Sequence, residues 1–479
     1  MNHIPSTSPD DSGSAIYRDF LQTPLARSER RAAGKALRER TPRAHHGIYV
    51  PRPDRPDPIA TILAQNQGRV ESLVPVRMGR MLASPFAFLR GSAAVMAADL
   101  APSPRTGIPV MACGDMHVSN FGLFASAERN LVFAINDFDE THPGPWEWDV
   151  KRLAASAAVA ARFLGGDRHA AEEAAHAAVS GYVRWIDRYS KLGLLEVWYC
   201  QIDEQDILDV CPKDLRKTTR KLLDKARARG HFTALDRLTH TVDGDQRLIE
   251  DRPIIVRETH MPDGRSVEQA LDRMLQSYVA SLSYDRRRLL MRYTLIDAVR
   301  KVVGVGSVGL ECWVLFLRGE GKDDPLFLQV KEARPSVLAP YAESQLPMEN
   351  QGHRVVAGQR LIQGSPDIFL GWGPNDGVPG KQYYVRQLAD MKGGVKFAEG
   401  DKAAVKGLAS YARLCGRALA LAHAKSGDAA MISGYCGCSD ALPDALARFA
   451  LAYAEQTEAD HAALDKAARA GRFAYVVGK

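Results

Sequence analysis

The sequence predicts an α+β fold in which a β-rich segment lies between two helical regions. Alanine-rich sequence from Asp149 to Ser190 has the apolar spacing of one or two helices. Between Arg300 and Arg386 the character changes to short β-type runs separated by glycine turns. After Gly400 the helical spacing returns, mainly over Ala403 to Lys425 and Leu442 to Ala470.

The composition is that of a soluble globular protein. Of the 479 residues, 46% are apolar and 25% charged, and the formal net charge of +6 is too small to indicate a nucleic-acid-coating protein. Met1 to Ser14 contain no apolar core of a signal peptide, and no stretch is apolar enough to span a membrane. The seven cysteines, an odd number without regular spacing, indicate a reducing compartment. We therefore expect a cytoplasmic protein without a membrane partner.

Composition shifts divide the chain into five predicted regions. The first is a basic, proline-rich N-terminal arm. Its composition predicts a solvated segment, although a basic arm can also bind phosphates. The others are a helical-lobe segment with a carboxylate loop, a helical substrate or insert region, a β lobe with a glycine loop, and C-terminal helices that complete the helical lobe. Their predicted bounds are 1–57, 58–190, 191–299, 300–395 and 396–479.

The first chemical signal is a loop rich in carboxylates. Asp115 follows a β-type run, Asn120 lies five residues later, and Asp137 ends the next β-type run. Phosphoryl transfer needs a group that orients the acceptor and takes its proton, and oxygen ligands that hold Mg²⁺ on the phosphates. These residues are also ordinary turn formers, but their order beside two strands favours catalysis, with Asp115 as base and Asn120 and Asp137 as metal ligands.

Four residues in or near this loop receive separate interpretations. His117 is expected to be a structural histidine that packs the loop. Asp139 and Glu140 either contact the metal or face solvent, and the sequence does not separate these alternatives. Asp149 opens a helix and is expected to anchor the loop by hydrogen bonds.

The second signal is a glycine loop far downstream. Gly304, Gly306, Ser307 and Gly309 precede a strand, a hairpin turn and a second strand that carries Lys331. Glycines let a backbone approach a polyphosphate, and a lysine on the third strand reaches the α- and β-phosphates, so we expect these residues to bind a nucleotide. A dinucleotide fold uses the same glycine spacing, but there the glycines open a helix, whereas β-type sequence continues here.

The lysine of a kinase-type site usually pairs with a carboxylate from a nearby helix. The predicted helix after Lys331 carries no acid. Glu343 and Glu349 are the nearest acidic residues, and the sequence leaves the partner open.

Together these motifs resemble the bacterial domain of unknown function 2252 family over about residues 45 to 460. The resemblance rests on Ser84 to Gly91, Gly114 to His117, Asn120 to Gly122, Asn136 to Glu140, Val302 to Gly309, Gln329 to Ala333 and Tyr384 to Leu388. That family is grouped with the protein-kinase-like superfamily, and the loop around Asp115 looks like that of aminoglycoside and choline kinases. The resemblance implies Asp115 and Lys331 as catalytic residues, Asn120 and Asp137 as Mg²⁺ ligands, and ATP as cofactor.

The chain departs from ordinary kinases in the order of its parts. The glycine loop and Lys331 follow the carboxylate loop, with Lys331 lying 194 positions after Asp137. A circularly permuted two-lobe kinase-like fold with extra helices accounts for this order; exchange of a lobe between subunits is the alternative.

The expected function is therefore that of a kinase-like phosphotransferase dependent on ATP and Mg²⁺, acting on an unidentified small molecule or protein. Two alternatives remain: transfer of AMP from the same site, and a non-enzymatic nucleotide-binding regulator. The expected partners are a nucleotide and the acceptor, and nucleic acid is not expected.

Overall fold

The computed structural model of the protein describes residues 21–228, 231–260, 264–302, 304–343, 348–373, 381–388 and 393–478. The α+β class predicted from the sequence is confirmed: helices dominate and strands form one larger sheet and three hairpins or pairs. The first twenty residues of the predicted arm lie outside the described ranges. None of the helices in the described part of the chain is long and apolar enough to cross a membrane.

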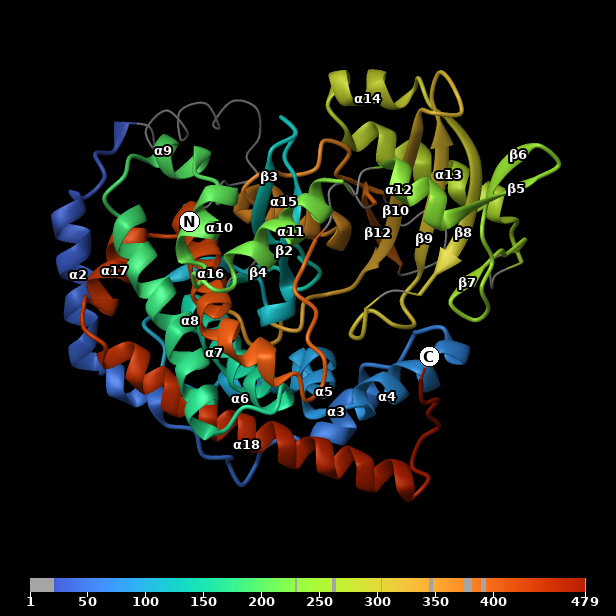
Figure 1. Cartoon of the computed structure of the whole chain (residues 1–479). Coiled ribbons are helices and arrows are strands. Elements are labelled where there is room, and N and C mark those ends of the chain that lie inside the picture. Colours follow the sequence, from blue (N-terminus) through green and yellow to red (C-terminus); the bar gives the residue numbers. More distant parts are fainter. Residues whose placement is uncertain are drawn as a thin grey trace, which may run out of the picture.

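The helices gather mainly before residue 300 and after residue 400 (Figure 1). The α-helices are α2 (Arg27–Arg40), α3 (Pro58–Ala64), α4 (Val74–Leu82), α5 (Pro85–Gly91), α6 (Ala93–Leu100), α7 (Trp146–Phe163), α8 (Arg168–Tyr189), α9 (Leu194–Tyr199), α10 (Glu204–Val210), α11 (Arg216–Arg227), α12 (His231–Leu238), α13 (Val267–Ser281), α14 (Tyr284–Leu290), α15 (Gln351–Ile362), α16 (Lys402–Ser426), α17 (Ala429–Cys436) and α18 (Ala441–Arg469). Short 3₁₀ helices are η1 (Arg43–Gly47), η2 (Glu71–Leu73) and η3 (Val118–Asn120).

The strands are β1 (Pro109–Ala112), β2 (Phe121–Ala125), β3 (Leu131–Ile135), β4 (His142–Pro145), β5 (Thr239–Val242), β6 (Asp245–Leu248), β7 (Ile255–Val256), β8 (Thr294–Lys301), β9 (Cys312–Arg318), β10 (Pro325–Ala333), β11 (Gly371–Gly373) and β12 (Gln382–Gln387). Six of them form one sheet in the order β11-β12-β10-β9-β8-β7, and every neighbouring pair is antiparallel. The hairpin β2–β3 and the pair β1–β4 stand apart from this sheet.

The main core is formed by long helices from both ends of the chain. α7 is buried over almost its whole length, and its alanines allow α8 and α18 to pack closely against it. α16, from the C-terminal half, packs along α8. The sheet has its own apolar clusters, one of which it shares with α13. Figure 1 shows the sheet at one side, the helical body at the other, and β2 and β3 between them.

The solvated arm expected before residue 58 is wrong for residues 27–47. α2 packs against α17, where Arg38 donates from Nε to the carbonyl of Tyr435 across 2.8 Å. Arg31 pairs with Asp187 at 2.8 Å, and His46 is 1% exposed beside Tyr435. The basic residues of this segment therefore fasten it to the helical body through long-range hydrogen bonds, which local composition does not reveal.

The helical character expected for residues 191–299 is only partly right. This stretch includes β5 to β8, and both β7 and β8 belong to the six-stranded sheet. The sheet therefore begins about forty residues before the predicted start of the β region at residue 300. The polar alternation of these strands, which are half exposed, resembles that of loops and surface helices.

Candidate functional site

A tight loop after β1 carries the first predicted site residues. Asp149, in the first turn of α7, accepts hydrogen bonds from the backbone nitrogens of Cys113 at 2.6 Å and Gly114 at 3.0 Å. Gly114 has a φ of +78°, and a Cβ there would come within 2.4 Å of the Glu140 carbonyl oxygen. Only glycine fits at this point, so the loop of Asp115 and the loop of Glu140 can touch. The predicted anchoring role of Asp149 is confirmed.

Asp115 is held by an arginine that the sequence analysis did not identify. Arg152, one turn beyond Asp149 on α7, donates from Nε to Asp115 Oδ1 at 2.9 Å and from a terminal nitrogen to the same oxygen. Burial raises the pKa of Asp115 and outweighs the opposing attraction of Arg152 and Arg90. The carboxylate is thus oriented by a guanidinium and is more basic than an exposed aspartate.

Asn120 and His117 shape the rest of this loop. The Asn120 side-chain amide donates from Nδ2 to the Asp115 carbonyl oxygen at 2.7 Å. His117 is buried, accepts a hydrogen bond on Nδ1 from the backbone of Ser119 at 3.2 Å, and lies with Nε2 3.8 Å from Asp115 Oδ2. Burial lowers the pKa of His117 well below its usual value, so the ring is neutral. The expected structural role of His117 fits these contacts.

Two carboxylates follow β3 and differ in their partners. Lys331 donates from Nζ to Asp139 Oδ2 at 2.6 Å, and the Tyr384 hydroxyl donates to Asp139 Oδ1 at 2.5 Å. Among the described residues no cation lies within ion-pair distance of the Asp137 carboxylate. Burial and the neighbouring charge of Asp139 raise the pKa of Asp137. Burial would also raise the pKa of Asp139, but Lys331 outweighs it and the pKa is lowered.

Lys331 lies inside β10, where its neighbour across the sheet is Tyr384 of β12. Its side chain is 5% exposed. Burial acts to lower the pKa of Lys331, but Asp139 outweighs burial and the pKa is raised, so the lysine remains charged. The partner left open by the sequence is therefore Asp139. Of the two expected candidates, Glu343 pairs instead with Arg105 at 2.5 Å.

The glycine loop joins β8 and β9 as a turn. Gly304 and Gly309 have φ angles of +69° and +88°, which favour glycine. Carbonyl oxygens of the turn accept hydrogen bonds from the segment before α4: Arg69 NH1 donates to Gly306 at 2.9 Å, and the Val70 backbone to Gly309 at 2.8 Å. The turn connects antiparallel strands and opens no helix, which removes the dinucleotide-type interpretation.

One cavity of about 360 Å³ brings these segments together. Its lining includes Asp115, Asn120, Asp137, Asp139, Gly304, Gly306 and Ser307. Lys331 reaches its wall through Asp139, and the Ser307 hydroxyl lies 3.5 Å from the same carboxylate. The cavity thus brings together the carboxylate loop and the glycine loop, whereas Lys331 does not line it and is linked to it only through its contact with Asp139. Gly309 lies at the far end of the turn, beside Arg69.

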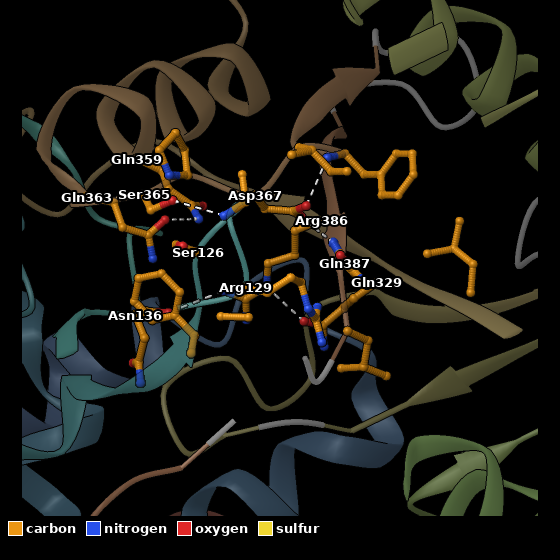
Figure 2. A pocket seen from close by; sticks show the side chains of 18 of the residues that line it. Ser126, Arg129, Asn136, Gln329, Gln359, Gln363, Ser365, Asp367, Arg386 and Gln387 are labelled. Carbon is orange, nitrogen blue, oxygen red and sulfur yellow. Dashed lines mark hydrogen bonds between the residues drawn. The ribbon is translucent and has the colours of Figure 1, made fainter. Parts of the chain in front are cut away.

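A second cavity of about 340 Å³ lies on the other side of Asn136 and Asp137. Figure 2 shows its amide-rich wall, with Asn136, Gln329, Gln359, Gln363 and Arg386. Arg386 donates to Gln329 Oε1 at 3.1 Å and to the Asn136 carbonyl at 3.3 Å. Asn136 lines this cavity, and the next residue, Asp137, lines the first cavity. The two cavities are therefore neighbours along this short segment of the chain.

The hydrogen bonds of this wall define the orientation of its amides. Gln363 donates from Nε2 to the Ile135 carbonyl at 3.2 Å, so its Oε1 is the acceptor for Gln359 Nε2 at 2.8 Å. Gln359 Oε1 is then left as a buried acceptor without a partner in the described structure. A buried unpaired acceptor costs about 1 to 3 kcal/mol, and a ligand with an N–H group would recover it.

Sequence reasoning missed Arg152, the pairing of Asp139 and the second cavity. Arg152 is spaced one helical turn from Asp149, a signal that could have been used. Asp139 carried no distinguishing signal, because its partner is 192 positions away. All seven cysteines are free, as expected for a chain without a disulfide framework. Within the described ranges, no group of three or more His, Cys, Asp or Glu side chains is placed to hold a metal ion.

Comparison with known families gives one match. Residues 69–467 match a family model described as "uncharacterized protein conserved in bacteria (DUF2252)", which covers most of the chain and contains every site residue predicted from the sequence. No curated protein and no solved structure matches the chain.

Proposed function

The chain belongs to the DUF2252 family, and we propose that it is a kinase-like phosphotransferase that uses ATP and Mg²⁺. One observation carries the proposal. A single cavity is lined by Asp115, Asp137 and a glycine turn, and a buried lysine reaches its wall. These are the parts needed to place a triphosphate, a metal ion and an acceptor hydroxyl around one point.

The order of parts in the sheet supports a kinase-like β lobe. The glycine turn joins the first two of three consecutive antiparallel strands, Lys331 lies on the third, and α15 follows it. Protein kinases use a glycine-rich loop over the phosphates and a lysine on the third strand. We propose that the sheet is the nucleotide lobe of a permuted two-lobe fold and that helices from both ends of the chain form the other lobe.

Asp139 takes the orienting role that a helix carboxylate has in protein kinases. α15 offers Arg354 and Gln359 in place of an acid, and Arg354 donates to backbone carbonyls of Asp139 and Arg334. The lysine is thus held by a residue of the carboxylate loop itself. This link would keep Lys331 charged and aimed at the α- and β-phosphates.

Asp137 and Asn120 fit the metal site. Asp137 is a partly buried carboxylate without a cation within ion-pair distance in the described structure, and burial together with the charge of Asp139 raises its pKa. The Asn120 amide uses its nitrogen on the loop, which leaves Oδ1 as the oxygen able to coordinate. Mg²⁺ is commonly held by one or two protein oxygens plus phosphates and waters, so two ligands suffice. A bound ion would neutralise phosphate charge.

Asp115 is proposed as the general base. Arg152 orients the carboxylate, and burial raises its pKa, which strengthens it as a proton acceptor. The acceptor hydroxyl would lose its proton to Asp115 as its oxygen bonds the γ-phosphorus and the bond to ADP breaks. The amide-rich cavity beyond Asn136 is the proposed place of the nucleobase, because it adjoins the metal site through consecutive residues.

The test is incubation with γ-labelled and, separately, α-labelled ATP, with Mg²⁺ and a pool of bacterial metabolites. Transfer of only the γ-label supports phosphoryl transfer. Transfer of only the α-label assigns AMP transfer. Nucleotide binding without transfer of either label, in any acceptor pool, favours the regulator. No binding of ATP with Mg²⁺ contradicts the proposal.

A further inference from the structure

The segment Ser84 to Gly91 contains an arginine that the proposed chemistry does not use. Ser84 caps α5 by accepting a hydrogen bond from the backbone of Ala87 at 3.1 Å, and Pro85 begins the helix. Phe86, Phe88 and Leu89 are buried in the core. Arg90 is left at the end of the helix, where it lines the cavity that holds Asp115.

Arg90 is one of three cavity arginines without an acidic partner. In the described structure, no carboxylate lies within ion-pair distance of Arg69, Arg77 or Arg90. Arg69 bonds only carbonyl oxygens, those of Gln65, Gly306 and Val308. Arg77, which is 1% exposed, bonds Asn66 and the Gly91 carbonyl, and its Nε has no partner.

Arg90 is the least satisfied of the three. Its Nε is buried without a hydrogen-bond partner, and no described residue accepts a hydrogen bond from its guanidinium. The guanidinium carbon lies 5.9 Å from the centroid of the Phe86 ring. A partly buried guanidinium with an unpaired nitrogen carries a desolvation cost, which an anion bound in the cavity would offset.

The carboxylates of the same cavity do not supply that anion: four of them have other partners or are weak counter-ions, and the fifth, Asp137, lies beyond ion-pair distance of Arg90 in the described structure. Asp115 is held by Arg152 and Asp139 by Lys331. Glu332 pairs with Arg334 at 2.9 Å and lies 3.7 Å from Lys381. Burial raises the pKa of Glu140 to about 7, which makes it a weak counter-ion.

The proton affinities of the arginines reflect the same imbalance. Burial lowers the pKa of Arg69 to about 10 and that of Arg77 to about 9. Burial also lowers the pKa of Arg90, although Asp115 and Asp137 act in the opposite direction. That opposing effect indicates that Arg90 is close to the proposed base and to the proposed metal ligand.

We propose that Arg69, Arg77 and Arg90 bind an anionic group of the acceptor beside Asp115, so that the substrate is a small molecule carrying a phosphate or carboxylate besides its hydroxyl. Planar guanidinium groups match both anions in a bidentate manner. That the anion belongs to an acceptor substrate rests on the proposed function. The anion site itself rests only on the three arginines.

The γ-phosphate of the nucleotide is the other source of an anion at this place. The triphosphate already has the glycine turn, Lys331 and the metal ligands, and those groups lie along the sheet and the carboxylate loop. The three arginines come from residues 69 to 90: Arg69 contacts the glycine turn through the carbonyl oxygens of Gly306 and Val308, whereas Arg90 lines the cavity together with Asp115, the proposed base. The acceptor side is therefore the better assignment.

The experiment uses inorganic phosphate as the probe. The full-length protein is saturated with Mg²⁺ and a non-hydrolysable ATP analogue, which occupies the γ-phosphate position, and phosphate is titrated by calorimetry. We expect saturable one-site binding that weakens about 30-fold or more in Arg90→Met. Arg168→Met is the matched control: its side chain is 70% exposed and pairs with Glu455, and phosphate binding should be unchanged.

A second readout separates ligand binding from a structural role. Removal of a desolvated, unpaired cation should leave the melting temperature without phosphate equal to or above that of the parent, while the rise on adding phosphate is lost. Loss of melting temperature without phosphate, with the phosphate-dependent rise retained, assigns Arg90 a structural role and overturns the inference.

The remaining outcomes are also decisive. Absence of saturable phosphate binding to the analogue-loaded parent overturns the inference. So does a loss of affinity in Arg90→Met for the ATP analogue but not for ADP, because the anion would then be the γ-phosphate. If the parent binds no nucleotide, the proposed function fails by itself; phosphate is then titrated into the free protein, where binding that depends on Arg90 still supports the anion site.

Discussion

Lys331 donates a hydrogen bond to Asp139 across 2.6 Å, although the two residues lie 192 positions apart. Asp139 is two residues beyond Asp137, and it also accepts a hydrogen bond from Tyr384. One short acidic segment therefore both orients the lysine and offers the proposed metal ligand. The sheet and the carboxylate loop are joined at this ion pair.

The pair should be energetically coupled. We expect Lys331→Met to lower the free energy of unfolding by about 3 kcal/mol, because it leaves a buried Asp139 without its cation. The double variant Lys331→Met with Asp139→Leu should be less destabilised than the sum of the single variants. Denaturant unfolding of all four proteins measures the coupling; strictly additive values would mean that the contact contributes nothing.

Asp115→Asn should abolish turnover while nucleotide affinity stays nearly unchanged. General-base assistance is worth roughly 10²- to 10⁴-fold in rate, and Asp115 lines the cavity in which the acceptor is proposed to bind. Turnover is measured at saturating ATP with the acceptor found by the labelling experiment. Asp54→Asn is the control, because its side chain is 74% exposed. Turnover equal to that of the parent would remove Asp115 from the base role.

Asp137→Ala should remove the dependence of nucleotide binding on Mg²⁺. The carboxylate is proposed to hold the ion beside the phosphates. In the described structure no protein cation lies within ion-pair distance of Asp137 to take the place of that ion. Calorimetry with ATP, with and without Mg²⁺, gives the effect of the ion in parent and variant. The same gain of affinity from Mg²⁺ in both proteins would contradict the metal assignment.

Gln359→Met should weaken ATP about tenfold and leave inorganic tripolyphosphate binding unchanged. The substitution keeps the volume of the side chain but removes the unpaired acceptor of the amide-rich cavity. Tripolyphosphate carries the phosphates without a base, so it reports the phosphate site alone. Equal weakening of both ligands would show that the cavity does not hold the nucleobase.

The unfolding free energy should fall in mildly acidic solution because of His46. Burial, with a smaller contribution from the charge of Lys151, lowers the pKa of His46 to about 3, against about 6.5 in an unfolded chain. The unfolded state therefore binds the proton first, and stability present above about pH 6.5 is lost as the pH falls. By about pH 5 the loss from this residue is about 2 kcal/mol.

The check is denaturant unfolding at about pH 7 and about pH 5. His46→Phe keeps an aromatic ring beside Tyr435 and should lose about 2 kcal/mol less than the parent between these values. His240→Phe, at an exposed position of β5, should behave as the parent does. A parent and a His46→Phe variant with the same pH dependence would contradict the buried neutral state of His46.

The local sequence predicted which residues belong to the candidate site better than it predicted which residues they contact. Asp115, Asn120, Asp137 and the glycine turn were recognisable because turn chemistry and strand patterns are local. Their meeting in one cavity could be inferred because one triphosphate must reach them all. The partner of Lys331 could not be predicted, since α15 offers no acid and Asp139 looked like an ordinary turn residue.

The N-terminal segment shows a second limit. The run of arginines between Arg27 and Arg43 predicted a solvated segment. Charge patterns alone do not reveal which backbone carbonyls these side chains contact. In the structure Arg38 and Arg43 bond carbonyl oxygens at the end of α17, almost four hundred positions later. Contacts of that range depend on the tertiary fold, and one sequence contains no direct signal for them.

The distance along the chain between Asp139 and Lys331 has a consequence for biosynthesis. A ribosome adds about 5 to 20 residues per second, so Lys331 is synthesised roughly 10 to 40 seconds after the carboxylate loop. Throughout that interval the nascent loop has Arg152 for Asp115 but no cation for Asp139. A messenger truncated before the codon for Lys331 would thus yield a chain with the acidic residues of the proposed centre, the glycine turn and β9, but without the lysine. The proposed nucleotide site is therefore incomplete until β10, and after it β12 with Tyr384, have been synthesised.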